Sequence, residues 1–259
     1  MYKLLTGCSM LLLATSASAI SNIESERPNL PEQGLDASVK LGLDGKTGND
    51  EEVDYAGSAK LIYRINDEVF LFIADKEYGS TRDIKDTDNA FLHTRWTHII
   101  TPTWGVEGFA QWEQDEFDNL KSRVLLGGGG RYLLWQKPDV YSFTLGLGAF
   151  HEEETQDLVS YQQTDNFWRV NAFYTYKYQV NKMVSLINTT YVQPRIGEAS
   201  DLRVLADFGL KVGITDSLAI TIAYKVTYDS DPAQNFDIDP PIDNYKTNTE
   251  YQTSIQYTF

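Results

Sequence analysis

The chain has 259 residues, with 37 acidic side chains against 22 basic ones, a formal net charge of −15 and a mean hydropathy of −0.37. A balance this acidic argues against nucleic acid as a partner, because binding to phosphates depends on Lys and Arg side chains. Cys8 is the single cysteine, so the sequence excludes an internal disulfide, and we expect no metal and no other cofactor.

The N-terminus has the layout of a secretory signal peptide. Lys3 precedes an apolar run over residues 4–14, and Ala17-Ser18-Ala19 has the small-x-small pattern of a cleavage site. Leu5-Thr6-Gly7-Cys8 resembles a lipoprotein box, but most of the apolar segment follows the cysteine, whereas that signal needs it in front. We therefore expect a signal peptide over residues 1–19, a periplasmic N-terminal tail over 20–33 and an outer-membrane barrel over 34–259.

The rest of the chain alternates apolar and polar residues with a period of two, which predicts β-strands. Leu218, Ile220 and Ile222, for example, alternate with Ala219 and Thr221. The segment at 69–74 fits less well because it is apolar on both faces. The alternation predicts twelve strands, near residues 34–44, 53–65, 68–78, 89–100, 104–115, 119–134, 140–152, 166–179, 183–194, 201–213, 217–229 and 246–259.

The connections between these strands alternate in length. Tight turns are expected at 66–67, 102–103, 137–139, 181–182 and 215–216, and longer, mostly acidic loops at 45–52, 79–88, 153–165, 195–200 and 230–245. Short turns at one end and longer loops at the other are typical of an up-and-down membrane barrel. A soluble β-sandwich is the alternative, but its strands average about 5–6 residues, whereas crossing hydrocarbon takes about 9–11. We therefore predict an all-β fold: a transmembrane antiparallel up-and-down β-barrel of about twelve strands, with short periplasmic turns and longer acidic extracellular loops.

The last strand ends the chain on an aromatic residue. Tyr251, Ile255, Tyr257 and Phe259 share its apolar face. This resembles the terminal strand that the barrel-assembly machinery of outer membranes reads, so that machinery, outer-membrane lipid and lipopolysaccharide are the expected partners. The same strand is expected to pair with residues 34–44 and close the barrel.

If the apolar face points outward, the opposite parity points into the lumen. The predicted lumen lining is Glu107, Glu113, Lys121, Arg123, Arg131, Arg169, Arg203, Asp207, Lys211 and Lys225, and the same parity places Lys40, Gln111, Asn171, Gln252 and Gln256 inward. A turn around Phe117 would set Glu113 opposite Lys121 and Gln111 opposite Arg123, where opposed charges stabilise a strand pair. These side chains form either an internal ion-pair network or a selectivity lining that attracts small anionic solutes.

Four glycines on the inward parity suggest a second feature of the lumen. Gly127 and Gly129 lie on one strand, and Gly146 and Gly148 lie on the next. Glycine within a strand marks a bend or a close approach. We expect these positions to leave a hollow in the wall that admits solute or an infolded loop.

No constellation of residues indicates catalysis. His93 and His98 have opposite parity, and His151 stands beside an acidic run without an accompanying serine motif, so all three are expected at a surface rim. We predict no enzymatic activity and keep an outer-membrane rim hydrolase using His151 as an unfavoured alternative. The acidic loop at 229–243, with Glu51, Glu52, Asp83, Asp86 and Asp88, is expected to be solvated; divalent cations are the alternative occupants.

Four segments together resemble the salt-induced outer-membrane protein family, which carries domain of unknown function 481. They are Leu41-Gly42-Leu43-Asp44-Gly45-Lys46-Thr47-Gly48-Asn49, Gly108-Phe109-Ala110-Gln111-Trp112-Glu113-Gln114-Asp115, Leu126-Gly127-Gly128-Gly129-Gly130-Arg131 and the stretch from Ala223 to Pro232. Asn49 is followed by Asp50 rather than the Thr or Ser common in the family, so the first loop differs. The resemblance implies an outer-membrane barrel, with expression tied to salt stress in some members, and no catalytic residues.

The prediction is an integral outer-membrane barrel of a Gram-negative bacterium, structural or stress-related, with or without a narrow solute channel. A porin specific for small anionic molecules or acidic oligosaccharides is the main alternative, and it would use the lumenal arginines.

Overall fold

In the computed structural model, twelve strands form one antiparallel sheet in which neighbours along the chain are neighbours in space. The strands are β1 (Gly34–Lys46), β2 (Glu52–Ile65), β3 (Glu68–Thr81), β4 (Ile84–Ile99), β5 (Trp104–Asp115), β6 (Leu120–Lys137), β7 (Tyr141–Leu158), β8 (Tyr161–Gln179), β9 (Val184–Arg195), β10 (Glu198–Gly213), β11 (Leu218–Asp229) and β14 (Thr247–Tyr257). The short β12 (Gln234–Asn235) and β13 (Ile242–Asp243) pair with each other between β11 and β14. The structure describes residues 22–24, 27–28, 30–46, 52–117, 119–138, 140–158, 161–215, 218–232, 234–235, 242–243 and 245–257.

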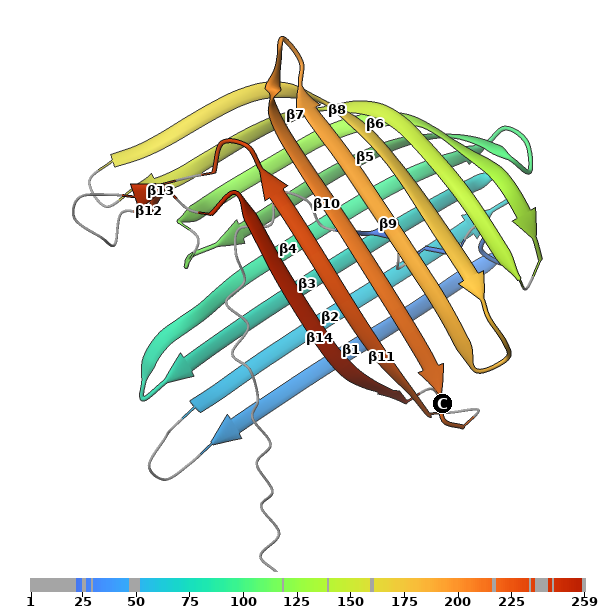
Figure 1. The fold of residues 1–259 in the computed structure, drawn as a ribbon, viewed down its shortest axis with the longest axis horizontal. Helices are drawn as coiled ribbons and strands as arrows, with labels where there is room; N and C mark the ends of the chain where they lie inside the picture. Colours follow the sequence, from blue (N-terminus) through green and yellow to red (C-terminus); the bar gives the residue numbers. More distant parts are fainter. Residues whose placement is uncertain are drawn as a thin grey trace, which may run out of the picture.

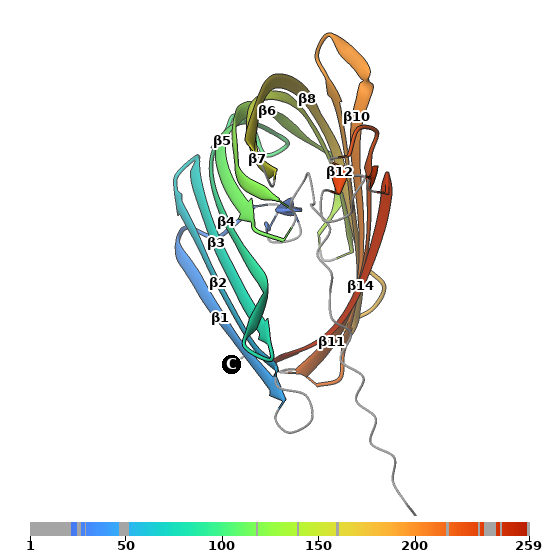
Figure 2. The same cartoon turned by 90° about the vertical axis from the view of Figure 1, so that its left-hand side faces the viewer.

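The sheet curls around an interior, so that the strands from β8 onward cross in front of the first strands (Figure 1). Seen from the side, β1–β5 form one wall, β10, β11 and β14 form the other, and β6–β8 join them (Figure 2). The all-β up-and-down prediction and the number of long strands are therefore confirmed. Within the described ranges no helix is long and apolar enough to cross a membrane.

Three of the segments predicted as longer loops are mostly strand. β3 and β4 meet at a two-residue turn in which Arg82 and Asp83 have φ values of 51° and 60°, as a tight hairpin requires. β7 and β8 pair as far as Leu158 and Tyr161, and β9 and β10 turn at 196–197. The loop predictions at 79–88, 153–165 and 195–200 are wrong because both faces of these strand ends are polar. The apolar alternation disappears there, although the backbone ladder continues.

The two faces of the sheet have opposite chemistry. Leu126, Leu147 and Trp168 on the outer face are 64%, 67% and 53% exposed, whereas Glu152 and Arg169 on the inner face are 1% exposed. A soluble protein buries its large apolar side chains and exposes its charges. This sheet does the reverse, as a strand between lipid and a filled interior requires.

One patch of the inner face is apolar. Val69, Leu71 and Ile73 of β3 lie inward with Ile62 of β2 and are buried against Ile23, which belongs to the N-terminal segment. This explains why the segment at 69–74 is apolar on both faces. Its outward residues lie on the apolar outer face of the sheet, and its inward residues pack against Ile23 inside the sheet.

The two edges of the sheet are β1 and β14. Within the described residues, β1 forms its ladder with β2 and β14 forms its ladder with β11. The predicted closure of the barrel by pairing β14 with β1 stays a prediction. Residues 258–259 lie outside the described part of the chain, as do the side chains of Ile255 and Tyr257.

Candidate functional site

The described residues between 22 and 31, here called the plug segment, lie inside the curled sheet rather than outside it (Figure 2). Ile23 and Glu24 are buried, and so is Arg27. The segment that the sequence suggested as a tail thus supplies side chains to the interior.

The plug segment is held by side chains of β2 and β8. Arg64 of β2 donates to the Pro31 carbonyl at 2.7 Å, and Lys177 of β8 donates to the Arg27 carbonyl at 2.5 Å. Gln33 and Asn66 exchange two hydrogen bonds where the chain enters β1. These contacts fix a short segment without a strand ladder by saturating its backbone acceptors.

Five charged side chains form what we call the plug cluster: Glu24, Arg27, Arg95, Glu107 and Arg131. Arg27 bridges Glu24 and Glu107, with 2.7 Å between guanidinium and carboxylate in each pair. Arg95 lies 2.9 Å from Glu107 and 3.2 Å from Glu24. Arg131 is held more loosely, 3.5 Å from Glu24 and 3.7 Å from Glu107. Within the described part of the chain, three cations against two carboxylates leave the cluster with one positive charge in excess.

Glu24 and Arg27 stabilise each other's charged forms. Burial by itself raises the pKa of Glu24, but the charges of Arg27, Arg131 and Arg95 outweigh it and hold that pKa below its ordinary value of 4.5. Burial disfavours the charged form of Arg27, yet Glu107 and Glu24 raise its pKa above the ordinary value. Both groups are therefore ionised at neutral pH, and the docking of the plug segment is an ionic interaction.

A second group of charges, the wall cluster, comes from strands alone. Its members are Glu113, Arg123, Glu152, Glu154, Arg169, Asp201, Arg203 and Asp229. Arg123 reaches Glu113 at 2.6 Å and Glu154 at 2.7 Å, and Arg169 reaches Asp201 at 2.8 Å. Five carboxylates against three guanidinium groups leave this cluster negative.

Between the clusters lies a layer of aromatic and polar side chains around a small cavity. Phe150, Tyr191 and Gln111 line the cavity together with His93 and Ile23. Nδ1 of His93 lies 3.1 Å from Oε1 of Gln111, and because an amide oxygen only accepts, the ring donates this hydrogen bond. Among the described residues, Nε2 of His93, Nε of Arg95 and the Tyr191 hydroxyl have no hydrogen-bond partner.

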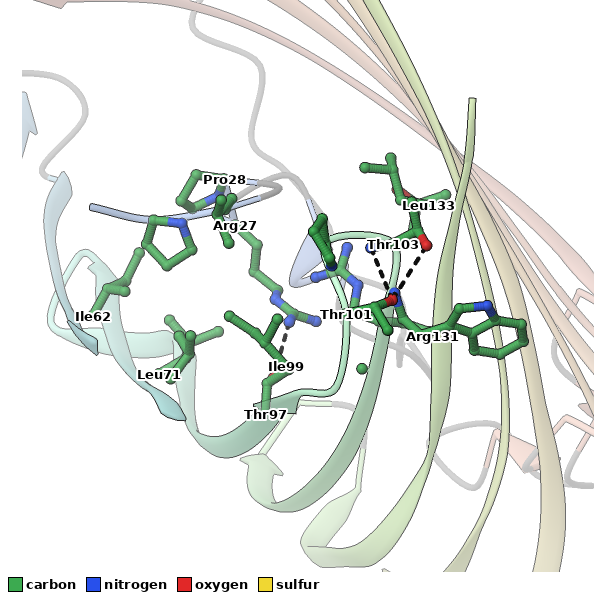
Figure 3. A pocket seen from close by; sticks show the side chains of 17 residues that line it. Arg27, Pro28, Ile62, Leu71, Thr97, Ile99, Thr101, Thr103, Arg131 and Leu133 are labelled. Atoms are coloured by element: carbon green, nitrogen blue, oxygen red, sulfur yellow. Dashed lines mark hydrogen bonds between the residues drawn. The ribbon is translucent and has the colours of Figure 1, made fainter. Parts of the chain in front are cut away.

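A recess lies between the plug segment and the turn that joins β4 to β5 (Figure 3). Its walls are mostly apolar, with Pro28, Ile62 and Leu71 on one side and Leu133 on the other. Arg27 donates to the Thr97 hydroxyl at its floor, 3.1 Å away. The recess therefore lies beside the plug segment.

Comparison with known proteins assigns this architecture. A family model described as "Protein of unknown function, DUF481" matches residues 39–259. The chain belongs to this family. The family resemblance drawn from the sequence is therefore confirmed.

Solved structures similar to this DUF481 member include a porin and the translocator domain of an autotransporter. The NanC porin, in a rhombohedral crystal form, matches with a TM-score of 0.50 and 13% identity over 85% of this chain and 100% of its own. The translocator domain of the autotransporter NalP from Neisseria meningitidis matches with a TM-score of 0.55 and 10% identity over 92% of this chain and 93% of its own. At these identities the likeness shows the fold alone. No curated protein matches the sequence.

Most of the suggested lumen residues lie on the inner face of this DUF481 barrel. Glu107, Glu113, Arg123, Arg131, Arg169 and Arg203 belong to the two clusters, and Gln111 and Asn171 are also buried. Asp207 and Lys225 face each other across β10 and β11, and Lys211 is exposed on the same parity. The side chains of Lys40, Gln252 and Gln256 lie outside the described residues.

The expected register between β5 and β6 is wrong by two residues. Glu113 pairs with Arg123 rather than Lys121, and Gln111 pairs with Leu125 rather than Arg123. A bulge between Leu120 and Ser122 inserts an extra residue, which leaves Lys121 exposed and breaks the parity that placed it inward.

The expected hollow at the glycines is also wrong. A Cβ on Gly146 would lie 1.9 Å from the Phe173 ring, and one on Gly129 would lie 2.5 Å from the Leu147 carbonyl oxygen. At Gly127 the nearest atoms belong to Phe150 and the Ala149 backbone. The glycines therefore permit close approach of β6, β7 and inward aromatic rings.

The three histidines occupy different surroundings. His93 is buried in the interior, so its expected place at a surface rim is wrong. His98 contacts Glu68 at 2.8 Å, and His151 packs edge-on against Trp168 on the outer face. No group of three or more potential metal ligands occurs among the described residues.

The partners of the lumenal arginines were not predicted from the sequence. Glu24 and Arg27 were assigned to a tail, and Glu154 was assigned to a loop. A usable signal existed in β7, where Glu152 and Glu154 continue the inward alternation of Gly146 and Gly148. Counting inward arginines would also have shown that carboxylates were needed to pair them.

Proposed function

We propose that this DUF481 protein is an integral, non-enzymatic β-barrel of the Gram-negative outer membrane whose lumen is occluded by the plug segment and by ion pairs. The observation that carries the proposal is the inverted distribution of side chains, with exposed aromatic and aliphatic residues outside and buried charges inside. Such an outer face is stable in hydrocarbon and would aggregate in water. Outer-membrane lipid, lipopolysaccharide and the barrel-assembly machinery are its proposed partners.

The pairing of the lumenal arginines favours an occluded barrel over an open, anion-selective porin. Arg123, Arg169 and Arg203 each lie within 3.0 Å of at least one carboxylate oxygen. A guanidinium that is already neutralised attracts passing anions weakly, because the neighbouring carboxylate cancels its field. We therefore propose that the occluded barrel has a structural role in the outer membrane.

A salt-stress role is the finer part of the proposal, and the family resemblance supports it. Loss of the gene should slow growth at high salt and leave growth at low salt unchanged. Equal growth of both strains at high salt would remove this part of the proposal and leave the barrel proposal untouched.

Membrane fractionation and planar-bilayer recording test the main proposal together. The protein should stay in the outer-membrane fraction after alkaline extraction, and the purified, folded protein should conduct little in bilayers made with salts of different ion size. Recovery in a soluble fraction would contradict membrane insertion. Large conductance that loses its anion preference in Arg203→Ala would favour the porin.

The proposed absence of enzymatic activity has its own experiment. A rim hydrolase would depend on His151, whose ring packs against Trp168. A His151→Ala strain is expected to keep the outer-membrane lipid composition of the parent. A lipid change that depends on His151 would show that the barrel is a hydrolase.

A further inference from the structure

Glu24 occupies a carboxylate site that the barrel wall itself provides. Its two oxygens face Arg95 at 3.2 Å and Arg131 at 3.5 Å, and both arginines belong to strands, β4 and β6. Of these three side chains, Glu24 alone comes from outside the sheet. Two guanidinium groups converging on one carboxylate are the usual arrangement for binding an anionic ligand.

The net charge of the strand residues in the plug cluster also favours a bound anion. Among the described residues of the plug segment, the charges of Glu24 and Arg27 cancel each other. When the plug segment is left out of the count, the strand residues Arg95 and Arg131 face one described carboxylate, that of Glu107. This leaves one positive charge in excess at a buried position. A buried excess charge is unfavourable, and a bound monoanion would neutralise it.

Unsatisfied polar atoms lie next to this carboxylate site. Nε2 of His93, Nε of Arg95 and the Tyr191 hydroxyl are buried without a hydrogen-bond partner among the described residues, and these side chains line the same small cavity beside Ile23. The three residues are 2%, 5% and 3% exposed. Buried polar atoms are normally paired, so a ligand that reaches past the carboxylate site with hydroxyl groups would satisfy them.

We propose that Arg95, Arg131, His93 and Tyr191 form a lumenal binding site for a small hydroxylated monocarboxylate, and that Glu24 is its internal competitor. This inference rests on the proposed occluded barrel and names the solute class that relieves the occlusion. The bound carboxylate replaces that of Glu24 between Arg95 and Arg131. Its hydroxyl groups bond to His93 and Tyr191.

The plug segment is built so that it can be exchanged. It forms no strand ladder with the sheet within the described residues, and Ile23 is the side chain that anchors it in the apolar patch. Its remaining attachments include the ion pairs of Glu24 and Arg27, the hydrogen bond from Arg27 to Thr97, a hydrogen bond between Asn22 and Asp207, and bonds to the backbone carbonyls of Arg27 and Pro31. A ligand that takes over the arginines removes a main attachment, so the segment and the ligand compete.

Calorimetric titration of folded, detergent-solubilised protein with gluconate tests the site directly. Gluconate has one carboxylate and several hydroxyl groups, and glucitol is the matched neutral compound. Glu24→Gln should bind gluconate about tenfold tighter than the parent or more, because a charge-assisted competitor is lost. Glucitol should not bind. Equal gluconate affinity in the parent and Glu24→Gln would overturn the proposal.

Further substitutions test whether the arginines form the gluconate site. In the Glu24→Gln background, Arg131→Gln should abolish gluconate binding, whereas Lys211→Gln, which removes an exposed cation from the same face, should leave it unchanged. Equal losses in both would mean that only lumenal net charge matters, and the site would be rejected. If Arg131→Gln does not fold, Arg131→Lys keeps the charge but loses the fork, and an unchanged affinity there would also reject the site.

Failure of this inference is separable from failure of the proposed function. Titration in detergent does not depend on where the protein resides in the cell, and membrane fractionation does not depend on gluconate. A protein that is recovered in the outer membrane but does not bind gluconate would retain the barrel proposal and lose the carboxylate site.

Discussion

Arg27 and Glu107 are 80 residues apart in sequence, yet their guanidinium and carboxylate groups are 2.7 Å apart inside the sheet. The pair joins the plug segment to β5, and the same guanidinium group bonds Glu24. Arg27 therefore links the plug segment to the strands, as does Glu24 through Arg95 and Arg131.

Arg27→Ala should release the plug segment without unfolding the barrel. Glu107 keeps Arg95 and Glu24 keeps Arg95 and Arg131, so no buried carboxylate is left without a cation. Charge-assisted hydrogen bonds contribute about 1.5–3 kcal/mol each, which corresponds to a rise in the undocked population of roughly tenfold or more. Cleavage after Glu24 by a glutamyl endoprotease measures that population in folded protein.

The control for this experiment is Gln33→Ala, which removes an exposed hydrogen bond to Asn66 at the end of the segment. Its cleavage after Glu24 should change little. A cleavage rate in Arg27→Ala equal to that of the parent would show that the pair with Glu107 does not hold the segment.

Acid should also release the plug segment. The pKa of docked Glu24 lies below its ordinary value of 4.5, so its contribution to docking is fully present above about that pH and is lost as the pH falls through the docked pKa. The charged groups that face Glu24 are Arg27, Arg95, Arg131 and Glu107, and the three arginines stay charged throughout. Bilayer conductance should therefore rise between pH 4.5 and strongly acidic conditions.

Glu24→Gln is the matched control for the acid effect. Its side chain does not titrate, so the acid step in conductance should shrink and the conductance at neutral pH should already be raised. An acid step of the same size in both proteins would assign the titration to another group.

Arg169 and Arg195 both contact Asp201, and comparing them tests how strongly burial affects the contribution of an arginine to the free energy of unfolding. Arg169 is 1% exposed and binds Glu152 at 3.0 Å and Asp201 at 2.8 Å. Arg169→Ala leaves Asp201 with the more distant Arg195 at 3.7 Å and removes one of the guanidinium partners of the buried Glu152, so it should cost about 3–5 kcal/mol of unfolding free energy. The Arg195 side chain is 37% exposed and lies 3.7 Å from Asp201, so Arg195→Ala should cost about 0–1 kcal/mol. Urea unfolding in lipid vesicles gives both values, and equal losses would contradict the argument from burial.

The strand pattern and the inner face could be predicted from the sequence because alternate residues differ in chemistry. Wherever one face is apolar, as at Leu218, Ile220 and Ile222, the parity is unambiguous. Where both faces are polar, as around Thr155 and Thr164, the pattern carries no information, although the two hydroxyl groups lie 3.0 Å apart across the strands.

The interior was harder to predict because its contacts join residues far apart along the chain. Nothing in the local sequence around Glu24 and Arg27 indicates that they meet Arg95, Glu107 and Arg131. The bulge at Lys121 is equally hidden, because the extra residue follows from the pairing of β6 with both of its neighbours. Parity arguments identify the side chains of a lumen, but the pairs within it depend on the register.

The terminal residue offers a prediction about assembly. Deletion of Phe259 should reduce the amount of folded barrel in the outer membrane, because the sequence pattern that the assembly machinery is expected to read then loses its last aromatic residue. Heat-modifiable migration of the outer-membrane fraction on gels measures folded protein. Phe259→Tyr keeps an aromatic end and should assemble normally, and normal assembly of the deletion variant would refute the assembly signal.

Alanine substitution should lower the free energy of unfolding at one glycine of β6 and leave it unchanged or raise it at the next. A Cβ on Gly129 would lie 2.5 Å from the Leu147 carbonyl oxygen and 2.7 Å from the Gly148 Cα, and these backbone atoms cannot move aside by changing a rotamer. Gly129→Ala should therefore cost about 1–3 kcal/mol of unfolding free energy. A Cβ on Gly130 meets only the Gly105 carbonyl oxygen at 3.8 Å, which is an ordinary contact. Gly130→Ala should be neutral or stabilise by about 0.4–1 kcal/mol, since alanine loses less backbone freedom on folding. Urea unfolding of the two variants separates close packing from a hollow wall, because an empty recess at Gly129 would accept the methyl group without loss.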